Sequence, residues 1–168
     1  MSFFTERHRN GGIDEVPVEG ASGRLWLCGK HFVGPDPEGA LARIEGDVIV
    51  CLNEAHEIER RYPGYIEWLV AHQPRRAVWH PIADLHAPDV EDAVGLTEQV
   101  RERLVDGEVV LVHCGAGIGR AGTLAVAVLM SMGASPPDAL ALVAASRPMA
   151  GPEAGVQREL IEALRSRW

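Results

Sequence analysis

The sequence lacks the features that would place the protein outside the cytoplasm. Its three cysteines, at positions 28, 51 and 114, cannot all pair with one another and show no CxxC spacing, so neither a disulfide framework nor a zinc site is indicated. Residues 1–23 contain no continuous apolar core of a signal peptide, and no later apolar run is long enough to span a membrane. We therefore expect a cytoplasmic protein that does not act at a membrane.

Positive charge is also in the minority. The 168 residues carry 16 Lys and Arg against 24 Asp and Glu, which gives a formal net charge of −8. This balance argues against nucleic acid as a main partner, although a local basic site is still compatible with it. The length suits one domain large enough to bury its own core, and the composition carries no information on the oligomeric state.

Short apolar runs alternate with amphipathic segments along most of the chain. The runs predict strands at 24–29, 48–52, 77–79 and 109–112, and residues 31–33 are expected to extend or pair with the first strand. Helices are predicted near 37–45, 63–70, 90–105, 124–130 and 136–146, followed by a last amphipathic helix. This alternation predicts a single α/β domain over residues 23–168, with a central, largely parallel sheet of about four to five strands flanked by helices. Residues 1–22 are polar and interrupted by glycine, and they predict a flexible N-terminal arm.

The stretch at 113–123 carries most of the chemical information. It reads His-Cys-Gly-Ala-Gly-Ile-Gly-Arg-Ala-Gly-Thr and joins a buried strand to the start of a buried helix. The N–H groups and the dipole of a helix N-terminus favour anions, and the glycines let the backbone wrap around one tetrahedral anion. Arg120 adds a bidentate fork for two phosphate oxygens, and the same donors favour the thiolate form of Cys114. The stretch therefore predicts a cysteine nucleophile in a cradle that binds phosphate or sulfate.

The pair His113-Cys114 followed by Arg120 resembles the HCxxGxxR signature of the cysteine-dependent protein tyrosine phosphatase superfamily. The segment 81–89, with Asp84 and Asp89, is similar to the general-acid loop of compact dual-specificity phosphatases, notably the cyclin-dependent-kinase-associated type. The resemblance covers roughly residues 24–165. It implies a cysteine-phosphatase-like fold, a phosphorylated protein as substrate, and no metal or cofactor.

A mechanism follows from the residue types. Cys114 attacks phosphorus to form a phosphocysteine, and Asp84 first donates a proton to the leaving oxygen and then accepts one from the hydrolytic water. His113 is expected to orient the loop and support the thiolate. The predicted phosphate-binding residues are Gly115, Ala116, Gly117, Ile118, Gly119 and Arg120.

Four residues have competing interpretations. Asp84 could merely cap a turn, but the Ile-Ala-Asp sequence before a proline-bounded loop favours acid chemistry. Asp89 is a second candidate acid, but it fits better as the N-cap of the following helix. His86 lies in the acid loop, where it could contact substrate or simply be an exposed loop histidine. Gln157 is similar in place to the glutamine that positions water in several subfamilies, and the alternative is an ordinary surface residue of the last helix.

Other anion-binding motifs fit less well. Residues 117–122 match G-x-G-x-x-G, but no acidic residue ends a second strand about twenty residues later, as a dinucleotide site requires. The glycines also lack the lysine of a nucleoside-triphosphate loop. Rhodanese-type sulfurtransferases place a cysteine in a similar cradle, but their loop is one residue shorter.

The sequence departs from the family pattern at Ala121, where relatives usually have serine or threonine. In relatives that hydroxyl hydrogen-bonds the cysteine sulfur and helps it leave, and Thr123, two positions later, is expected to face away. We therefore expect slow hydrolysis of the phosphocysteine. A pseudophosphatase that only binds phosphoproteins and a small-molecule phosphatase stay open as alternatives. No lysine occupies the variable loop positions Gly115, Ala116 and Ile118, which favours a monophosphate on a protein side chain over an inositol polyphosphate.

Overall fold

The protein is described by a computed structural model that covers residues 3–168, with side chains described from residue 7 onwards. A five-stranded sheet in the order β1-β2-β5-β3-β4 forms its centre. The strands are β1 (Ile13–Val16), β2 (Arg24–Gly29), β3 (Val48–Cys51), β4 (Ala77–Trp79) and β5 (Val109–Cys114). All neighbouring pairs are parallel except β1 with β2, so the predicted α/β class and largely parallel sheet are confirmed.

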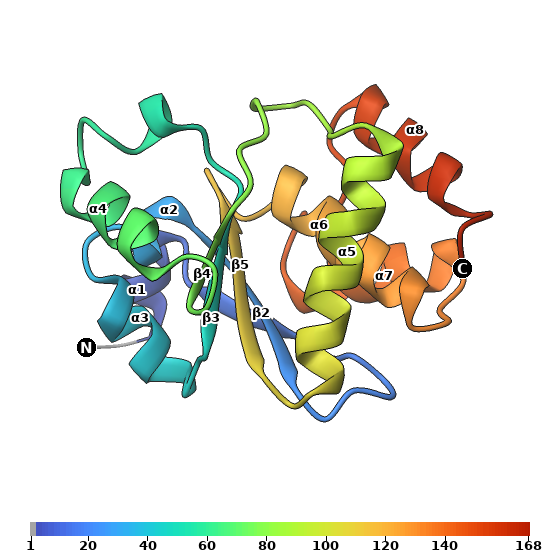
Figure 1. The fold of residues 1–168 in the computed structure, drawn as a ribbon, viewed down its shortest axis with the longest axis horizontal. Coiled ribbons are helices and arrows are strands. Elements are labelled where there is room, and N and C mark those ends of the chain that lie inside the picture. The colour runs from blue at the N-terminus through green and yellow to red at the C-terminus, as the bar shows by residue number, and fades with distance from the viewer. Residues whose placement is uncertain (1–2) are drawn as a thin grey trace.

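Helices cover both faces of the sheet (Figure 1). One side holds α2 (Lys30–Val33), α3 (Pro37–Ile44) and α4 (Pro63–His72), with α1 (Phe3–Asn10) and the short 3-10 helix η1 (Ala55–Glu57) nearby. The other side holds α5 (Val90–Val105), α6 (Gly119–Ser131), α7 (Pro136–Ser146) and α8 (Gly155–Leu164). Because both faces are covered, the central strands β3 and β5 are almost wholly apolar.

Capping side chains mark the starts of three helices. Asp36, Asp89 and Ser135 are the N-caps of α3, α5 and α7, and each side chain accepts a hydrogen bond from the backbone N–H three residues later. Asp89 Oδ1 lies 2.9 Å from Asp92 N, which supports its interpretation as a cap.

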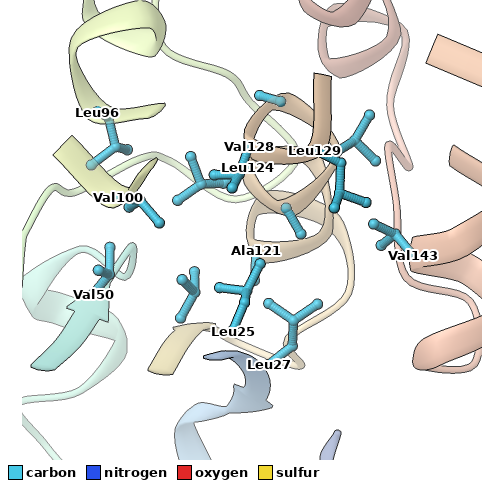
Figure 2. Packing of buried hydrophobic residues seen from close by; sticks show 14 of the residues in the cluster. Leu25, Leu27, Val50, Leu96, Val100, Ala121, Leu124, Val128, Leu129 and Val143 are labelled. Carbon is cyan, nitrogen blue, oxygen red and sulfur yellow. The ribbon is translucent and has the colours of Figure 1, made fainter. Parts of the chain in front are cut away.

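Two hydrophobic clusters fill the space between sheet and helices. The larger one joins the sheet to α5, α6, α7 and α8, and the smaller one joins it to α2, α3 and α4. Figure 2 shows the larger cluster around α6, where Ala121 lies close to Leu25 and Leu27 of β2. Helix α6 is buried along nearly its whole length, and this fixes the loop in front of it against β2 and β5.

Two N-terminal predictions need correction. Residues 13–16, expected within a flexible arm, form β1 and pair in antiparallel fashion with β2, and Val16 is buried. Residues 31–33, expected to extend or pair with the first strand, lie in α2. The chain turns there because Lys30 N donates to Gly115 O, and Gly34 N donates to Lys30 O to close one helical turn. Strand β1 depends on its pairing with β2, and helix α2 depends on backbone hydrogen bonds, one of them to the distant Gly115. The apolar pattern of the sequence does not predict either kind of contact.

Candidate active site

Cys114 is the last residue of β5, and the loop 115–118 leads directly into α6. The loop opens into a cleft of about 800 Å³, here called the Cys114 cleft. Its lining comes from α1, the start of α2, η1, the acid loop, the 115–120 segment and the chain after α7. The carboxyl end of a central parallel strand is where α/β proteins commonly place ligands.

The carbonyl groups of the loop are all held from outside. Lys30 N donates to Gly115 O at 3.0 Å, Arg147 donates to Ala116 O at 2.8 Å and to Gly117 O at 3.1 Å, and Ile118 O accepts from the N–H groups of residues 122 and 151. No N–H group of residues 115–118 donates to a backbone acceptor of residues 3–168 or to a side chain of residues 7–168. The loop therefore keeps its N–H donors available for an anion, as the predicted phosphate cradle requires.

Gly117 is required by geometry. Its φ is +74°, and a Cβ at this position would lie 2.2 Å from the carbonyl oxygen of Cys28. The loop thus crosses directly over β2, and only a residue without a side chain fits.

Arg147 anchors the loop to the N-terminal segment. This side chain is buried, and besides the two loop carbonyls it pairs with Asp14 of β1 at 2.7 Å. Asp14 also pairs with Arg7 of α1 at 2.6 Å. The Asp14 carboxylate therefore links α1 and β1, through Arg7 and Arg147, to the loop 115–118. No sequence pattern predicts these ion pairs.

Arg120 forms a largely buried, bidentate ion pair with Glu57. Nη1 and Nη2 donate to the two carboxylate oxygens at 2.8 Å each, and Nη1 also donates to Ile82 O at 2.8 Å. Asn53 Nδ2 and Glu54 N donate to the same carboxylate, at 2.9 and 2.7 Å. Burial raises the pKa of Glu57. The hydrogen bonds from Arg120 and from the Glu54 N–H lower it by more, so the resulting pKa is about 2. Glu57 is thus ionised and fixes the guanidinium plane.

The Nε–H of Arg120 has no partner within the described residues, although it is buried. A buried donor without an acceptor costs free energy, so its presence beside the free N–H groups of the loop indicates a site built for an oxyanion. Asp84 Oδ1 lies 3.2 Å from Nη2 of the same arginine. The structure thus brings Cys114, Arg120 and Asp84 to one cleft.

The acid loop forms a tight turn that exposes Asp84. Its side chain is 70 % exposed, Leu85 adopts a φ of +61°, and His86 N donates to Ala83 O. His86 does not line the Cys114 cleft. Its Nδ1 lies 2.8 Å from Asp84 O, and the residue lines a second, mostly apolar pocket that shares Arg120 with the Cys114 cleft. His86 is exposed, as the alternative of an exposed loop histidine expects, and its contact with substrate stays a prediction.

Gln157 is fully buried, which excludes the alternative of a surface residue. Its Oε1 accepts from Glu153 N at 2.7 Å and Ala154 N at 3.3 Å, and its Nε2 donates to His86 O at 3.2 Å. The side chain therefore ties the start of α8 to the acid loop.

His113 lies behind the loop in a fully buried site. Its Nε2 is 2.5 Å from the hydroxyl of Tyr65, and its Nδ1 is 3.3 Å from Cys114 O. Burial lowers the pKa of His113 to about 4, and the nearby Arg120 charge acts in the same direction, so the ring is neutral at pH 7. Burial also raises the pKa of Cys51 to about 12 and that of Cys28 well above its usual value, so both are inert core thiols.

Two features bear on the departure at position 121. Ala121 is fully buried and belongs to the same apolar cluster as Cys114. The hydroxyl of Thr123 donates to Gly119 O at 2.7 Å, one helical turn back, so its proton is already used within α6. No other hydroxyl of the 113–123 segment replaces the missing one.

Sequence reasoning missed four residues around the cradle, namely Glu57, Arg147, Asp14 and Lys30. Glu57 and Asp14 meet their arginines only through the tertiary fold, and no short-range pattern marks them. Lys30 could have been noticed, because it is the only lysine in the sequence. Within the described residues, no cluster of three or more His, Cys, Asp or Glu side chains is placed to hold a metal ion, and no helix is long and apolar enough to cross a membrane.

Comparison with known proteins identifies the family. A family model described as "PTP-SAK: Swiss Army Knife protein, DSP-PTPase phosphatase domain" matches residues 34–166. No curated protein matches the chain.

Solved structures resemble most of the chain. The crystal structure of Tk-PTP in its active form shares 29% identity with a TM-score of 0.69, and the match covers 92% of this chain and 97% of that one. Kinase associated phosphatase (KAP), with its catalytic-site cysteine replaced by serine, shares 22% identity with a TM-score of 0.78 over 93% and 94% of the two chains. The human tyrosine phosphatase-like serine/threonine/tyrosine-interacting protein shares 25% identity with a TM-score of 0.67 over 89% and 94%. With the family model spanning most of its length, the chain belongs to the phosphatase domains of the dual-specificity (DSP-PTPase) type, as a compact cysteine phosphatase.

Proposed function

We propose that this domain hydrolyses phosphomonoesters on protein side chains, without a metal ion, through a phosphocysteine on Cys114. The observation that carries the proposal is the unpartnered, buried Nε–H of Arg120 beside the free loop N–H groups. These donors suit the equatorial oxygens of a phosphoryl group, and their positions are fixed before substrate arrives.

The reaction has two steps. In the first, the Cys114 thiolate attacks phosphorus in line, the bond to the substrate oxygen breaks, and Asp84 gives that oxygen its proton. In the second, the Asp84 carboxylate takes a proton from water, the water oxygen attacks phosphorus, and the sulfur leaves as thiolate with release of inorganic phosphate. The contact between Asp84 and Arg120 keeps the carboxylate beside the reacting group.

Gln157 acts on this chemistry as a positioning residue. Through its bond to His86 O it holds the turn that carries Asp84, two residues earlier in the chain. For the predicted role in positioning water, its amide would have to exchange one of these backbone partners for water. The observed contacts favour the support of the acid loop.

A phosphorylated protein is the favoured substrate. The loop itself contributes no lysine, and Glu153 places a carboxylate oxygen against Gly119, where a Cβ would lie 2.1 Å from it. An inositol polyphosphate would therefore bring several negative charges close to the carboxylates of Asp84 and Glu153. The exposed position of Asp84 and the short acid loop suit a shallow pocket that takes phosphotyrosine as well as phosphoserine or phosphothreonine.

Hydrolysis of para-nitrophenyl phosphate in the presence of EDTA tests the proposal. We expect wild-type activity in EDTA, no activity in Cys114→Ser, and a loss of about a hundredfold or more in Asp84→Asn. Asp89→Asn is the matched control, because asparagine still caps α5 while the carboxylate is removed. Equal losses in Asp84→Asn and Asp89→Asn would contradict the assignment of the acid, and loss of activity in EDTA would contradict the metal-independent mechanism.

A second function is favoured by one observation, the alanine at position 121. A domain that forms or binds the phosphoryl adduct but does not release it would act as a phosphoprotein-binding pseudophosphatase. The similarity to the tyrosine phosphatase-like interacting protein fits this alternative. Absence of any wild-type hydrolysis, together with binding of phosphopeptides, would support it over the enzyme. A panel of inositol phosphates and nucleotides, assayed alongside the phosphopeptides, tests the small-molecule alternative.

A further inference from the structure

Lys30 is the only lysine among the 168 residues, and it lies beside the loop 115–118. It is the first residue of α2, directly after the end of β2, and its N–H donates to Gly115 O at 3.0 Å. The side chain is partly buried and lines the Cys114 cleft together with Cys114 and Arg120. All other Lys or Arg positions in the chain are arginine.

The ammonium group of Lys30 has no carboxylate partner within the described residues. Its one hydrogen bond is donated to the main-chain oxygen of Glu57, at 3.1 Å. The Glu57 carboxylate itself is saturated by Arg120, Asn53 and the Glu54 N–H. An ammonium carries three N–H donors, so Lys30 keeps its charge and two donors for another acceptor.

Three arginines of the cleft differ in this respect. Arg120 is paired with Glu57, while Arg7 and Arg147 share Asp14. The protein has a net charge of −8, so the unpaired positive charge of Lys30 is not part of a generally basic surface. It produces a local positive potential at the edge of the phosphate cradle.

We propose that Lys30 binds a second anionic group of the substrate, a carboxylate or phosphate on a residue next to the phosphorylated side chain. This inference rests on the proposed function and specifies its substrate class. The carboxylates of Asp84 and Glu153 occupy other parts of the cleft rim, so the second anion is accepted on the side of α2 and η1. Lys30 would thus determine the specificity for substrates with an anionic residue next to the phosphorylated one.

Three phosphotyrosine peptides test the proposal. The first carries glutamate on both sides of the phosphotyrosine, the second carries glutamine there, and the third carries phosphoserine there. Wild type, Lys30→Gln and Lys30→Arg are compared by kcat/KM on each peptide. For wild type we expect the glutamate peptide to exceed the glutamine peptide by about two- to fivefold, the upper part of the range for one accessible ion pair.

Lys30→Gln should bring this ratio close to one, and Lys30→Arg should restore most of it. A merely structural role, in which Lys30 fastens η1 through Glu57 O, would lower kcat/KM equally for the glutamate and glutamine peptides and would leave the ratio unchanged. That outcome would overturn the proposal. A ratio above one for phosphoserine but not for glutamate would identify the second group as phosphate.

A binding measurement separates this inference from the proposed function. Fluorescence anisotropy of the same peptides on Cys114→Ser, with and without Lys30→Gln, gives the charge preference without turnover. If wild type fails to hydrolyse para-nitrophenyl phosphate while the Lys30-dependent preference persists in binding, the proposed catalysis is wrong and the subsite stands. If hydrolysis is observed but neither kinetics nor binding depends on the flanking charge, the subsite is refuted.

Discussion

Restoring a hydroxyl at position 121 should accelerate the breakdown of the phosphocysteine. Relatives usually have serine or threonine directly after the arginine, where the hydroxyl hydrogen-bonds the departing sulfur. Here position 121 lies in the first turn of α6 and is fully buried (Figure 2). It belongs to the same apolar cluster as Cys114. The hydroxyl of Thr123 is bonded to Gly119 O, so it does not replace the missing donor.

The expected size follows from one hydrogen bond to a charged sulfur. Such a bond contributes about 1.5–3 kcal/mol, and if it forms chiefly as the thiolate is released, the rate changes by about ten- to a hundredfold. Formation of the phosphocysteine should change less, because the sulfur loses negative charge in that step. We therefore expect Ala121→Ser to raise the steady-state rate and to leave the rate of the first step nearly unchanged.

Rapid-quench and stopped-flow measurements with para-nitrophenyl phosphate check this prediction. Wild type should release a burst of para-nitrophenol close to one equivalent per Cys114 and then turn over slowly. In Ala121→Ser the burst should shrink as the second step becomes faster. Mass spectrometry after acid quench should show phosphorylated wild type and little phosphorylated Ala121→Ser.

Ala125→Ser is the matched control for burying a hydroxyl. Ala125 is also fully buried in the larger cluster, one helical turn further along α6 and farther from the loop. Its hydroxyl should lower the free energy of unfolding by about 1–3 kcal/mol without accelerating turnover. A wild type without a burst, or an Ala121→Ser protein that is folded and turns over at the wild-type rate, would refute the reasoning.

Two further predictions concern the residues behind the loop. Glu57→Gln should lower kcat/KM for para-nitrophenyl phosphate by about ten- to a hundredfold, since the Arg120 guanidinium is no longer fixed. It should also lower the free energy of unfolding by about 3 kcal/mol, because a buried ion pair is broken. Wild-type kinetics and an unchanged urea midpoint would contradict this prediction. The pKa of His113 is lowered by burial to about 4, so its contribution to stability is complete above pH 6.5, its usual pKa, and is lost as the pH falls from 6.5 towards 4. Between pH 7 and pH 5 this amounts to about 2 kcal/mol in the free energy of unfolding by urea, and an NMR titration that places the His113 ring near pH 6.5 would contradict it.

The fold class could be predicted because its signals are local. Continuous apolar runs such as 48–51 and 109–112 mark strands covered on both faces, and the caps at Asp89 and Ser135 mark helix starts within three residues. The strand β1 could not be predicted in this way. It is short and polar, and it exists because it pairs with β2 and because Asp14 meets Arg147.

Within the site, the sequence by itself determined the chemistry of the loop. A cysteine, glycines and an arginine at fixed spacing between a strand and a helix place a thiol, a set of N–H donors and a helix dipole together by backbone geometry alone. Only the tertiary structure decided how this loop is held and what surrounds it. Glu57 reaches Arg120 from 63 positions away and Asp14 reaches Arg147 from 133 positions away, while Lys30 enters the cleft through the pairing of β2 with β5. Contacts at such separations depend on the packing of distant segments, and no pattern within a single segment encodes them.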